Sequence, residues 1–142
     1  MVARLLIACA LMAICVIIHA GGMTAALENL PPFVASAARS FWRGARLFIM
    51  VAIWIVMLHL FEISVWALVY FWRGAIEDVQ TAFYFSAVTY TTTGYGDVLL
   101  PHDWRLAGGV EALTGILMCG WSTAFFFAIV SNFHEHRNRI ED

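Results

Sequence analysis

A short polar segment separates two long apolar runs in this chain, and it reads Thr91-Thr92-Thr93-Gly94-Tyr95-Gly96-Asp97. Inside a bilayer, backbone that is not helical survives only where it is buried in protein or lines a water-filled path. Two glycines separated by one residue let a strand adopt backbone angles that turn successive carbonyls to the same side. We call residues 91–97 the glycine segment. Clusters of Thr, Gly and Tyr also form ordinary turns, which is the alternative interpretation.

The composition is that of a membrane protein. Hydrophobic residues make up 62% of the 142 residues and charged residues 13%, so the chain has no room for a sizeable soluble domain. The net charge of −2 gives no indication of a nucleic-acid partner. The three cysteines lie in apolar runs, where they act as small hydrophobic side chains. Because no zinc-type Cys/His spacing and no Ser-His-Asp arrangement is present, we expect that the protein is not an enzyme.

The apolar runs predict an all-α membrane protein with three transmembrane helices per subunit. The run of residues 47–72 is long enough to cross ~30 Å of hydrocarbon. A helix over 79–91 is too short to cross and leads directly into the glycine segment, so we expect it to be re-entrant. The predicted parts are an N-terminal transmembrane helix (1–27), a cytoplasmic linker (28–46), an outer helix (47–73), a re-entrant loop (74–104), an inner helix (105–133) and a short charged tail (134–142).

Two interpretations of the first apolar run are open. Arg4 followed by Leu5 to Ile18 fits a secretory signal peptide, but Ile18-His19-Ala20 is a poor cleavage context. We favour a retained span with its N-terminus outside, because this places the glycine segment at the outer face.

The linker carries three arginines, Arg39, Arg43 and Arg46, spaced as one stripe of a helix. This spacing predicts a short interfacial helix, and a solvated basic loop is the alternative. Either structure places the linker, and with it the C-terminal tail, in the cytoplasm by the positive-inside rule. We expect a multi-pass protein of the cell (inner or plasma) membrane.

The residues Thr92-Thr93-Gly94-Tyr95-Gly96-Asp97 resemble the selectivity filter of potassium channels, which usually reads T-V-G-Y-G-D. Thr93 replaces the commoner valine or isoleucine. The resemblance extends over about residues 47–133 and implies a homotetramer that conducts K⁺ passively, with four loops around one axis. It implies that backbone carbonyls line the filter at Thr92, Thr93, Gly94, Tyr95 and Gly96, with K⁺ bound at Thr92, Thr93, Gly94 and Tyr95.

The same resemblance assigns roles outside the filter. Tyr84 and Phe85 occupy positions where the family carries aromatic residues that brace the filter. Val88 replaces the carboxylic acid that pairs with the filter aspartate in some relatives, so we expect Asp97 to bind a nearby Tyr or Trp. Gly115 matches the hinge glycine of the inner helix. Gly120 is the competing candidate.

The inner helix contains further candidates. Thr114, Met118 and Ser122 recur every four residues, and they either face a central cavity or pack inside the subunit. The residues Phe125, Phe126 and Phe127 lie toward the inner end. One of these three rings in each subunit can close the water path by dewetting if it faces the axis, and the alternative is contact with lipid.

Ionisable side chains inside the apolar runs are the remaining candidates. His59 and Glu62 share one helical face, where they either hold helices together or sense protons. Glu111 is a predicted hydrogen-bond anchor for the short helix. Asp103 either caps the last helix or joins Asp97 in an acidic ring that concentrates cations.

Potassium conduction is the function that we predict from these residues. The chain has no helix with arginine at every third position, so we expect no voltage sensor, and we expect no soluble regulatory domain. The sequence does not indicate what opens the channel. The alternatives are a non-conducting subunit, which would have a damaged filter, and a non-selective cation channel, which would have an altered Tyr95 or glycine.

Overall fold

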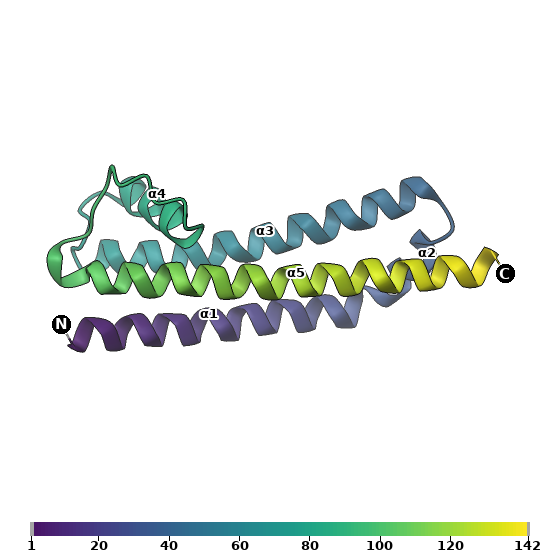
Figure 1. Cartoon of the computed structure of the whole chain (residues 1–142), viewed down its shortest axis with the longest axis horizontal. Helices are drawn as coiled ribbons and strands as arrows, with labels where there is room; N and C mark the ends of the chain where they lie inside the picture. The colour runs from purple at the N-terminus through teal and green to yellow at the C-terminus, as the bar shows by residue number, and fades with distance from the viewer. Residues whose placement is uncertain (1, 142) are drawn as a thin grey trace.

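The chain folds into a bundle of three long helices, with two shorter helices and one 3₁₀ turn packed against them (Figure 1). The structure is a computed structural model that describes residues 2–141, with side chains described for residues 2–139. The elements are α1 (Val2–Asn29), α2 (Pro31–Ala37), α3 (Phe41–Trp72), α4 (Val79–Tyr90), η1 (His102–Trp104) and α5 (Arg105–Glu141). The described residues form no strand, and the predicted all-α class is confirmed.

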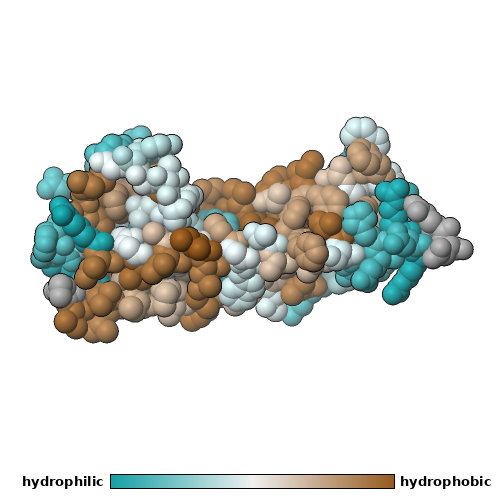
Figure 2. Space-filling view, viewed as in Figure 1, coloured by the Kyte–Doolittle hydropathy of each residue, from teal (hydrophilic) through white to brown (hydrophobic). Residues whose placement is uncertain are grey.

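Three segments have the length and apolar composition to cross a membrane, namely Val2–Asn29, Phe41–Trp72 and His102–Arg139. Hydrophilic side chains gather at the two ends of the bundle and hydrophobic ones cover most of the face between them (Figure 2). A 32-residue helix such as α3 is ~48 Å long at 1.5 Å per residue, which exceeds the ~30 Å hydrocarbon core. The ends of these helices therefore extend into the polar layers.

Helix α4 begins near one end of the bundle, and the chain that follows it returns to the same end through the glycine segment (Figure 1). At the start of α4, the Asp78 carboxylate accepts hydrogen bonds of 2.7 Å from both the backbone N–H and the hydroxyl of Thr81. This N-cap satisfies amides that the first turn of a helix leaves unpaired. Helix α4 packs against α3 and α5 and ends at Tyr90, from where the chain returns to η1. The start of α1 lies at this same end.

Two clusters of buried apolar side chains hold the bundle together. The first lies near the end with η1, where the Tyr70 ring contacts Phe85 and Trp104 edge to face, with centroids 5.6 and 5.9 Å away. The second lies near α2 and joins α1, α2, α3 and α5 through residues such as Val34 and Phe133. These clusters fix α4 against α3 at one end and α2 against the long helices at the other.

The predicted interfacial helix with all three arginines is wrong. Pro31 and Pro32 open α2, as suits residues that lack a backbone N–H, but α2 ends at Ala37. Arg39 lies in the turn that follows, and Ser40 is extended with φ −159°. Because this turn breaks the helical path, the two other arginines belong to the first turns of α3.

The C-terminal tail also differs from the expectation. Residues 134–141 continue α5 instead of forming a separate tail. This stretch has no glycine or proline to end a helix, and His136 Nδ1–H donates to the Asn132 carbonyl at 3.0 Å.

Gly115 allows α5 to approach the end of α4 closely. A Cβ atom on Gly115 would lie 1.8 Å from the Tyr90 carbonyl oxygen and 2.7 Å from the carbonyl carbon. Both are backbone atoms, so no side-chain rotation can relieve the clash. A Cβ on Gly120 would meet no heavy atom within 4 Å. Gly115 is therefore a contact point between two helices, whereas Gly120 leaves open space on its side of α5.

We expect the substitution Gly115→Ala to destabilise the fold by at least the ~1–3 kcal/mol typical of overpacked cores, because α4 has to move away from α5. Gly120→Ala is the matched control, and it should be neutral or stabilising because alanine favours a helix. Thermal unfolding followed by tryptophan fluorescence measures both. Equal unfolding midpoints for the two variants would contradict the close approach.

Candidate functional site

The glycine segment is exposed on the single chain, and the sign of its φ angles alternates along residues 92–96. The φ angles are positive at Thr92 (59°), Gly94 (51°) and Gly96 (78°), and negative at the intervening Thr93 and Tyr95. In an ordinary strand, successive carbonyls point to opposite sides. Alternation between left-handed and right-handed angles instead brings them to one side. Positive φ at every second residue is the backbone pattern that such a row of carbonyl oxygens requires.

Thr92 is the strained member of this row. A β-branched residue at positive φ is a genuine outlier, and such strain costs ~1–3 kcal/mol. It persists only where the surroundings impose it, and strained residues cluster at functional sites. Thr92 N–H donates to Thr89 O at 2.9 Å, and Gly94 N–H donates to Val88 O at 3.0 Å. These bonds to the last turn of α4 hold the strained backbone in place.

The Asp97 end of the glycine segment is held by Tyr84, which projects from α4. Its hydroxyl donates to Asp97 Oδ2 at 2.7 Å, and this bond lowers the pKa of Asp97 below its ordinary value. Tyr84 is thus the nearby aromatic partner that the sequence analysis expected for Asp97. Val88 is half-buried and contributes its carbonyl, and Phe85 packs against Tyr70 of α3.

A buried polar cluster lies at the C-terminal end of α4, directly before the glycine segment. It joins His59 and Glu62, the two ionisable residues predicted on α3, to Tyr90, and Tyr90 donates to Glu62 Oε2. The other two members are His19 of α1 and Ser122 of α5. The sequence analysis did not single out Tyr90 as a site residue. Its position before the glycine segment was the signal that could have identified it.

Glu111 lies on α5 and is fully buried. Its Oε2 accepts a 2.9 Å hydrogen bond from the hydroxyl of Tyr70. That bond joins α5 to α3, whereas we expected an anchor for the short helix. Ser86 of α4 faces the same carboxyl, so Glu111 lies where all three helices meet.

The stripe of Thr114, Met118 and Ser122 does not face a central cavity. The three side chains are 0–5% exposed and pack inside the chain, and Ser122 belongs to the polar cluster. The face of α5 that remains free within the chain carries other residues, among them Leu113, Ile116, Leu117, Gly120 and Phe127. The cavity interpretation of the stripe is therefore wrong, because α1, α3 and α4 occupy the space that it needed.

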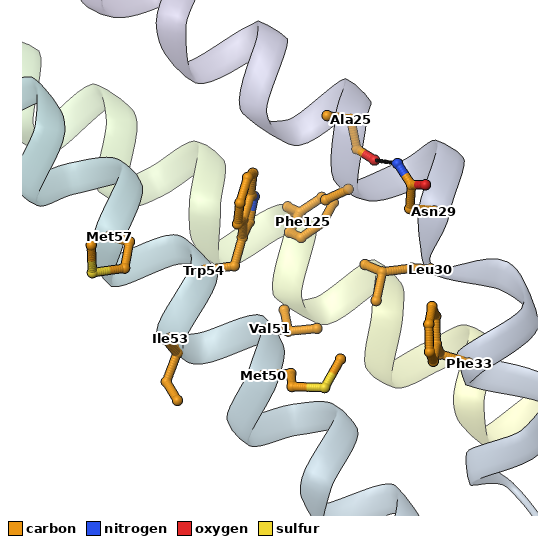
Figure 3. Close-up of a pocket in the computed structure, with 11 residues that line it drawn as sticks. Ala25, Asn29, Leu30, Phe33, Met50, Val51, Ile53, Trp54, Met57 and Phe125 are labelled. Carbon is orange, nitrogen blue, oxygen red and sulfur yellow. Dashed lines mark hydrogen bonds between the residues drawn. The ribbon is translucent and has the colours of Figure 1, made fainter.

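The three phenylalanines of α5 have different surroundings. Phe125 is buried and lines a cavity of about 410 Å³ together with residues of α1, α2 and α3 (Figure 3). Phe126 packs against Phe48 of α3, with centroids 6.1 Å apart. Phe127 is 70% exposed and points away from the chain's own core. Of these three rings, only that of Phe127 is free to face a neighbouring subunit or an axis.

Asp103 neither caps α5 nor remains a free charge. Its carboxylate forms an ion pair with Arg4 near the start of α1. The Arg4 guanidinium also lies over the Trp104 ring, 5.7 Å from its centroid. Arg4 thus connects α1 to the end of the bundle that carries the glycine segment.

The comparisons with known proteins agree with this geometry. The model of a protein family described as "Ion channel" matches residues 53–132, more than half of the chain. The matched range contains most of α3, all of α4, the glycine segment and most of α5, and leaves α1 and α2 outside. No curated protein and no solved structure matches the chain.

We expect the substitution Tyr84→Phe to raise the pKa of Asp97, because the lost hydrogen bond favours the ionised carboxylate. The bond stabilises the fold above that pKa and is lost as the pH falls through it. Carboxyl ¹³C NMR shifts recorded against pH measure the change. Asp78 is the internal control, because its own pKa is lowered by Thr81 and should not move. An unchanged Asp97 titration would show that Tyr84 does not hold the segment.

Proposed function

This chain belongs to the ion channel family, and we propose that it is a potassium-selective channel whose filter is the glycine segment. Ions cross passively along the row of carbonyls. The oxygens of Thr92, Thr93, Gly94, Tyr95 and Gly96 replace the hydration shell of K⁺.

The observation that carries the proposal is the alternating backbone of the glycine segment. Positive φ at residues 92, 94 and 96 is the pattern that a row of carbonyls on one side requires, and the strain at Thr92 fits a functional site. Helix α4 ends directly before the segment, so its C-terminal partial negative charge favours a cation there.

Four copies of the chain complete the filter in this proposal. One segment provides one wall, and it is exposed along residues 91–97. A homotetramer encloses the ion with four such walls on a common axis. The free face of α5, with Phe127 toward the inner end, then meets the other subunits or lines the path.

The orientation follows from the charges at the two ends. The linker arginines belong in the cytoplasm by the positive-inside rule. The start of α1 and the glycine segment lie together at the opposite end, joined by the Arg4–Asp103 ion pair. The N-terminus and the filter therefore face outside, which agrees with a retained first helix.

Ion flux in liposomes under K⁺ and Na⁺ gradients tests the proposal. The purified chain should conduct K⁺ and exclude Na⁺. Gly94→Ala should abolish flux, because alanine is strained at φ 51° and its methyl group changes the wall of the filter. Gly74→Ala is the matched control, since Gly74 also has positive φ (65°) and open space around its Cβ but lies in the outer turn. It should keep selective flux.

Each other result points to a different function. Equal K⁺ and Na⁺ flux would make the protein a non-selective cation channel. An assembled tetramer without flux would make it a non-conducting subunit. Selective flux in Gly94→Ala would refute the filter assignment.

We also predict that Phe127 restricts the inner end of the path. Phe127→Ala should increase K⁺ flux or open probability, because it removes an exposed apolar ring that can dewet a narrow path. Phe125→Ala is the comparison: it removes a buried ring from the bundle and should cost ~3–5 kcal/mol of stability without raising flux. Single-channel recording measures the open probability. No increase in Phe127→Ala would leave this ring in contact with lipid.

A further inference from the structure

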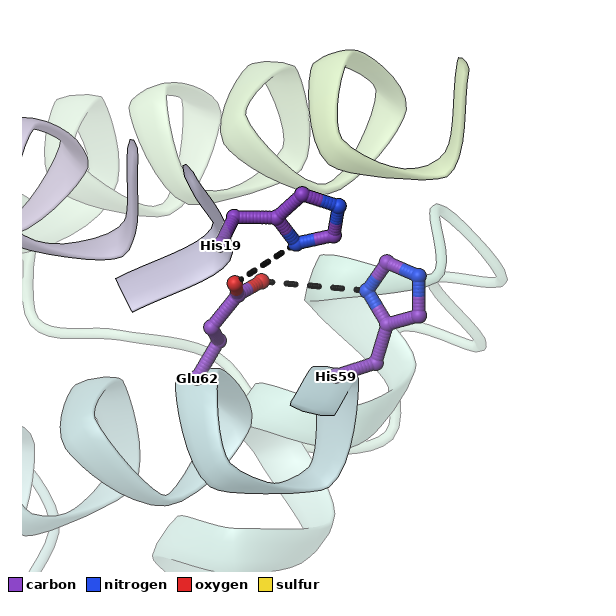
Figure 4. A group of neighbouring side chains, drawn as sticks. All are labelled: His19, His59 and Glu62. Atoms are coloured by element: carbon purple, nitrogen blue, oxygen red, sulfur yellow. Dashed lines mark hydrogen bonds and ion pairs between the residues drawn. The ribbon is translucent and has the colours of Figure 1, made fainter. Parts of the chain in front are cut away.

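His19 of α1 and His59 and Glu62 of α3 point their polar atoms toward one another (Figure 4). His19 Nδ1 lies 2.9 Å from Glu62 Oε1, and His59 Nδ1 lies 3.7 Å from Glu62 Oε2. One ligand atom from each of the three residues lies within 4.8 Å of the others. We propose that these three side chains bind a divalent transition-metal ion of the Zn²⁺ class, with Tyr90 as the fourth ligand.

The donor set and its spacing suit such an ion. Two imidazoles and one carboxylate form a common ligand set for zinc. Bonds of 2.0–2.1 Å in a tetrahedron place ligand atoms ~3.4 Å apart, and the 2.9 and 3.7 Å separations lie on either side of this value. The Tyr90 hydroxyl oxygen lies 3.0 Å from His59 Nδ1 and in contact with Glu62, which places it to serve as the fourth ligand.

A count of hydrogen atoms shows how the cluster can accommodate an ion. Tyr90 donates its one hydroxyl hydrogen to Glu62, so His59 Nδ1–H donates to the Tyr90 oxygen. His19 Nδ1–H donates to Glu62. When both histidines carry one hydrogen each, both Nε2 atoms need a donor, and both face Ser122 Oγ, at 3.1 and 3.2 Å. A serine hydroxyl has one hydrogen and satisfies only one of them, so the cluster needs either one more proton or an ion.

Metal binding at the two Nδ1 atoms removes this conflict. Each histidine then carries its hydrogen on Nε2, and both Nε2–H groups donate to Ser122 Oγ, which has two lone pairs to accept them. Histidine ligands almost always donate their second ring N–H to such a partner, which fixes the tautomer and the ring orientation. Ser122 Oγ thus accepts a hydrogen bond from each of the two histidines. It acts as a positioning residue and not as a ligand.

The charges also balance. Glu62 is fully buried, and an isolated carboxylate at that depth is costly. A divalent ion with two neutral imidazoles, the Glu62 carboxylate and the Tyr90 phenolate has no net charge, and the phenol proton goes to solvent as the ion binds. The side chain of His59 is 15% exposed and gives the ion an entry route.

The ion would attach α1 to the base of the glycine segment. His19 lies outside the family match, whereas the other four residues of the cluster lie inside it. Tyr90 is the last residue of α4, and its carbonyl faces Gly115 of α5. A bound ion therefore joins α1, α3 and α4 directly before residue 91, and α5 through Ser122, which makes the site a clamp for the N-terminal helix.

The purified full-length chain in detergent micelles tests the site with Zn²⁺ and Co²⁺. After incubation with Zn²⁺ and dialysis, we expect one ion per chain by elemental analysis and a higher midpoint of thermal unfolding. Co²⁺ should give the intense visible absorption of a tetrahedral site. Binding should weaken as the pH falls, because protons compete for the Nδ1 atoms. Each of His19→Gln, His59→Gln and Glu62→Gln should lose the ion and the spectrum.

His102→Gln is the matched control, because the His102 side chain is 90% exposed at the outer end and should not affect binding. Circular dichroism identifies variants that remain helical, and only their spectra are compared, so a misfolded Glu62→Gln leaves the two histidine variants decisive. Absence of a retained ion would overturn the proposal, as would a spectrum that survives in folded His19→Gln and His59→Gln. If the midpoint of thermal unfolding changed with pH in the same way without any metal, that result would also overturn the proposal and make the cluster a proton-binding site.

Discussion

Hydrocarbon offers no hydrogen bonds to peptide groups, and this constraint shapes the whole bundle. Most of the chain meets it with helices. The glycine segment is not helical, so other residues must bind its polar groups. The carbonyls of Thr89 and Val88 accept hydrogen bonds from its backbone N–H groups, and the Tyr84 hydroxyl donates to Asp97. Helix α4 is the source of all three contacts. The position of α4 therefore decides the geometry of the glycine segment, and the packing of α3 and α5 around α4 helps to set it.

The end of α4 is the most crowded point of the molecule. On one side, Gly115 brings the backbone of α5 against the Tyr90 carbonyl, where a methyl group would not fit. On another, the Tyr90 hydroxyl enters the polar cluster with Glu62 and His59. One residue is thus held through its backbone by α5 and through its side chain by α3. A shift of either helix has to move Tyr90, and with it the first residues of the glycine segment.

The sequence predicted the long helices well and their contacts poorly. Long apolar runs identify α1, α3 and α5, because a bilayer allows few other structures for them. The partner of Asp97 could be predicted only as an aromatic residue. Tyr84 lies 13 positions away in the sequence and reaches Asp97 only because the chain after α4 turns back along that helix. The stripe that ends at Ser122 was left open between cavity lining and packing for the same reason: periodicity shows that residues share a face, but not which neighbour covers it. Here α1 covers part of that face, and nothing in the sequence places His19 beside Ser122.

The charges at the outer end show how one added helix changes the electrostatics of the mouth. Both Asp97 and Asp103 were candidates for a ring that concentrates cations. The Arg4 side chain of α1 neutralises Asp103, so that carboxylate adds little to the field. Asp97 binds a neutral phenol, which stabilises its charge without cancelling it and lowers its pKa. In the proposed channel, the attraction for cations at the mouth would therefore come from Asp97 at the end of the glycine segment. Without α1 and its Arg4, Asp103 would keep its charge and share that attraction.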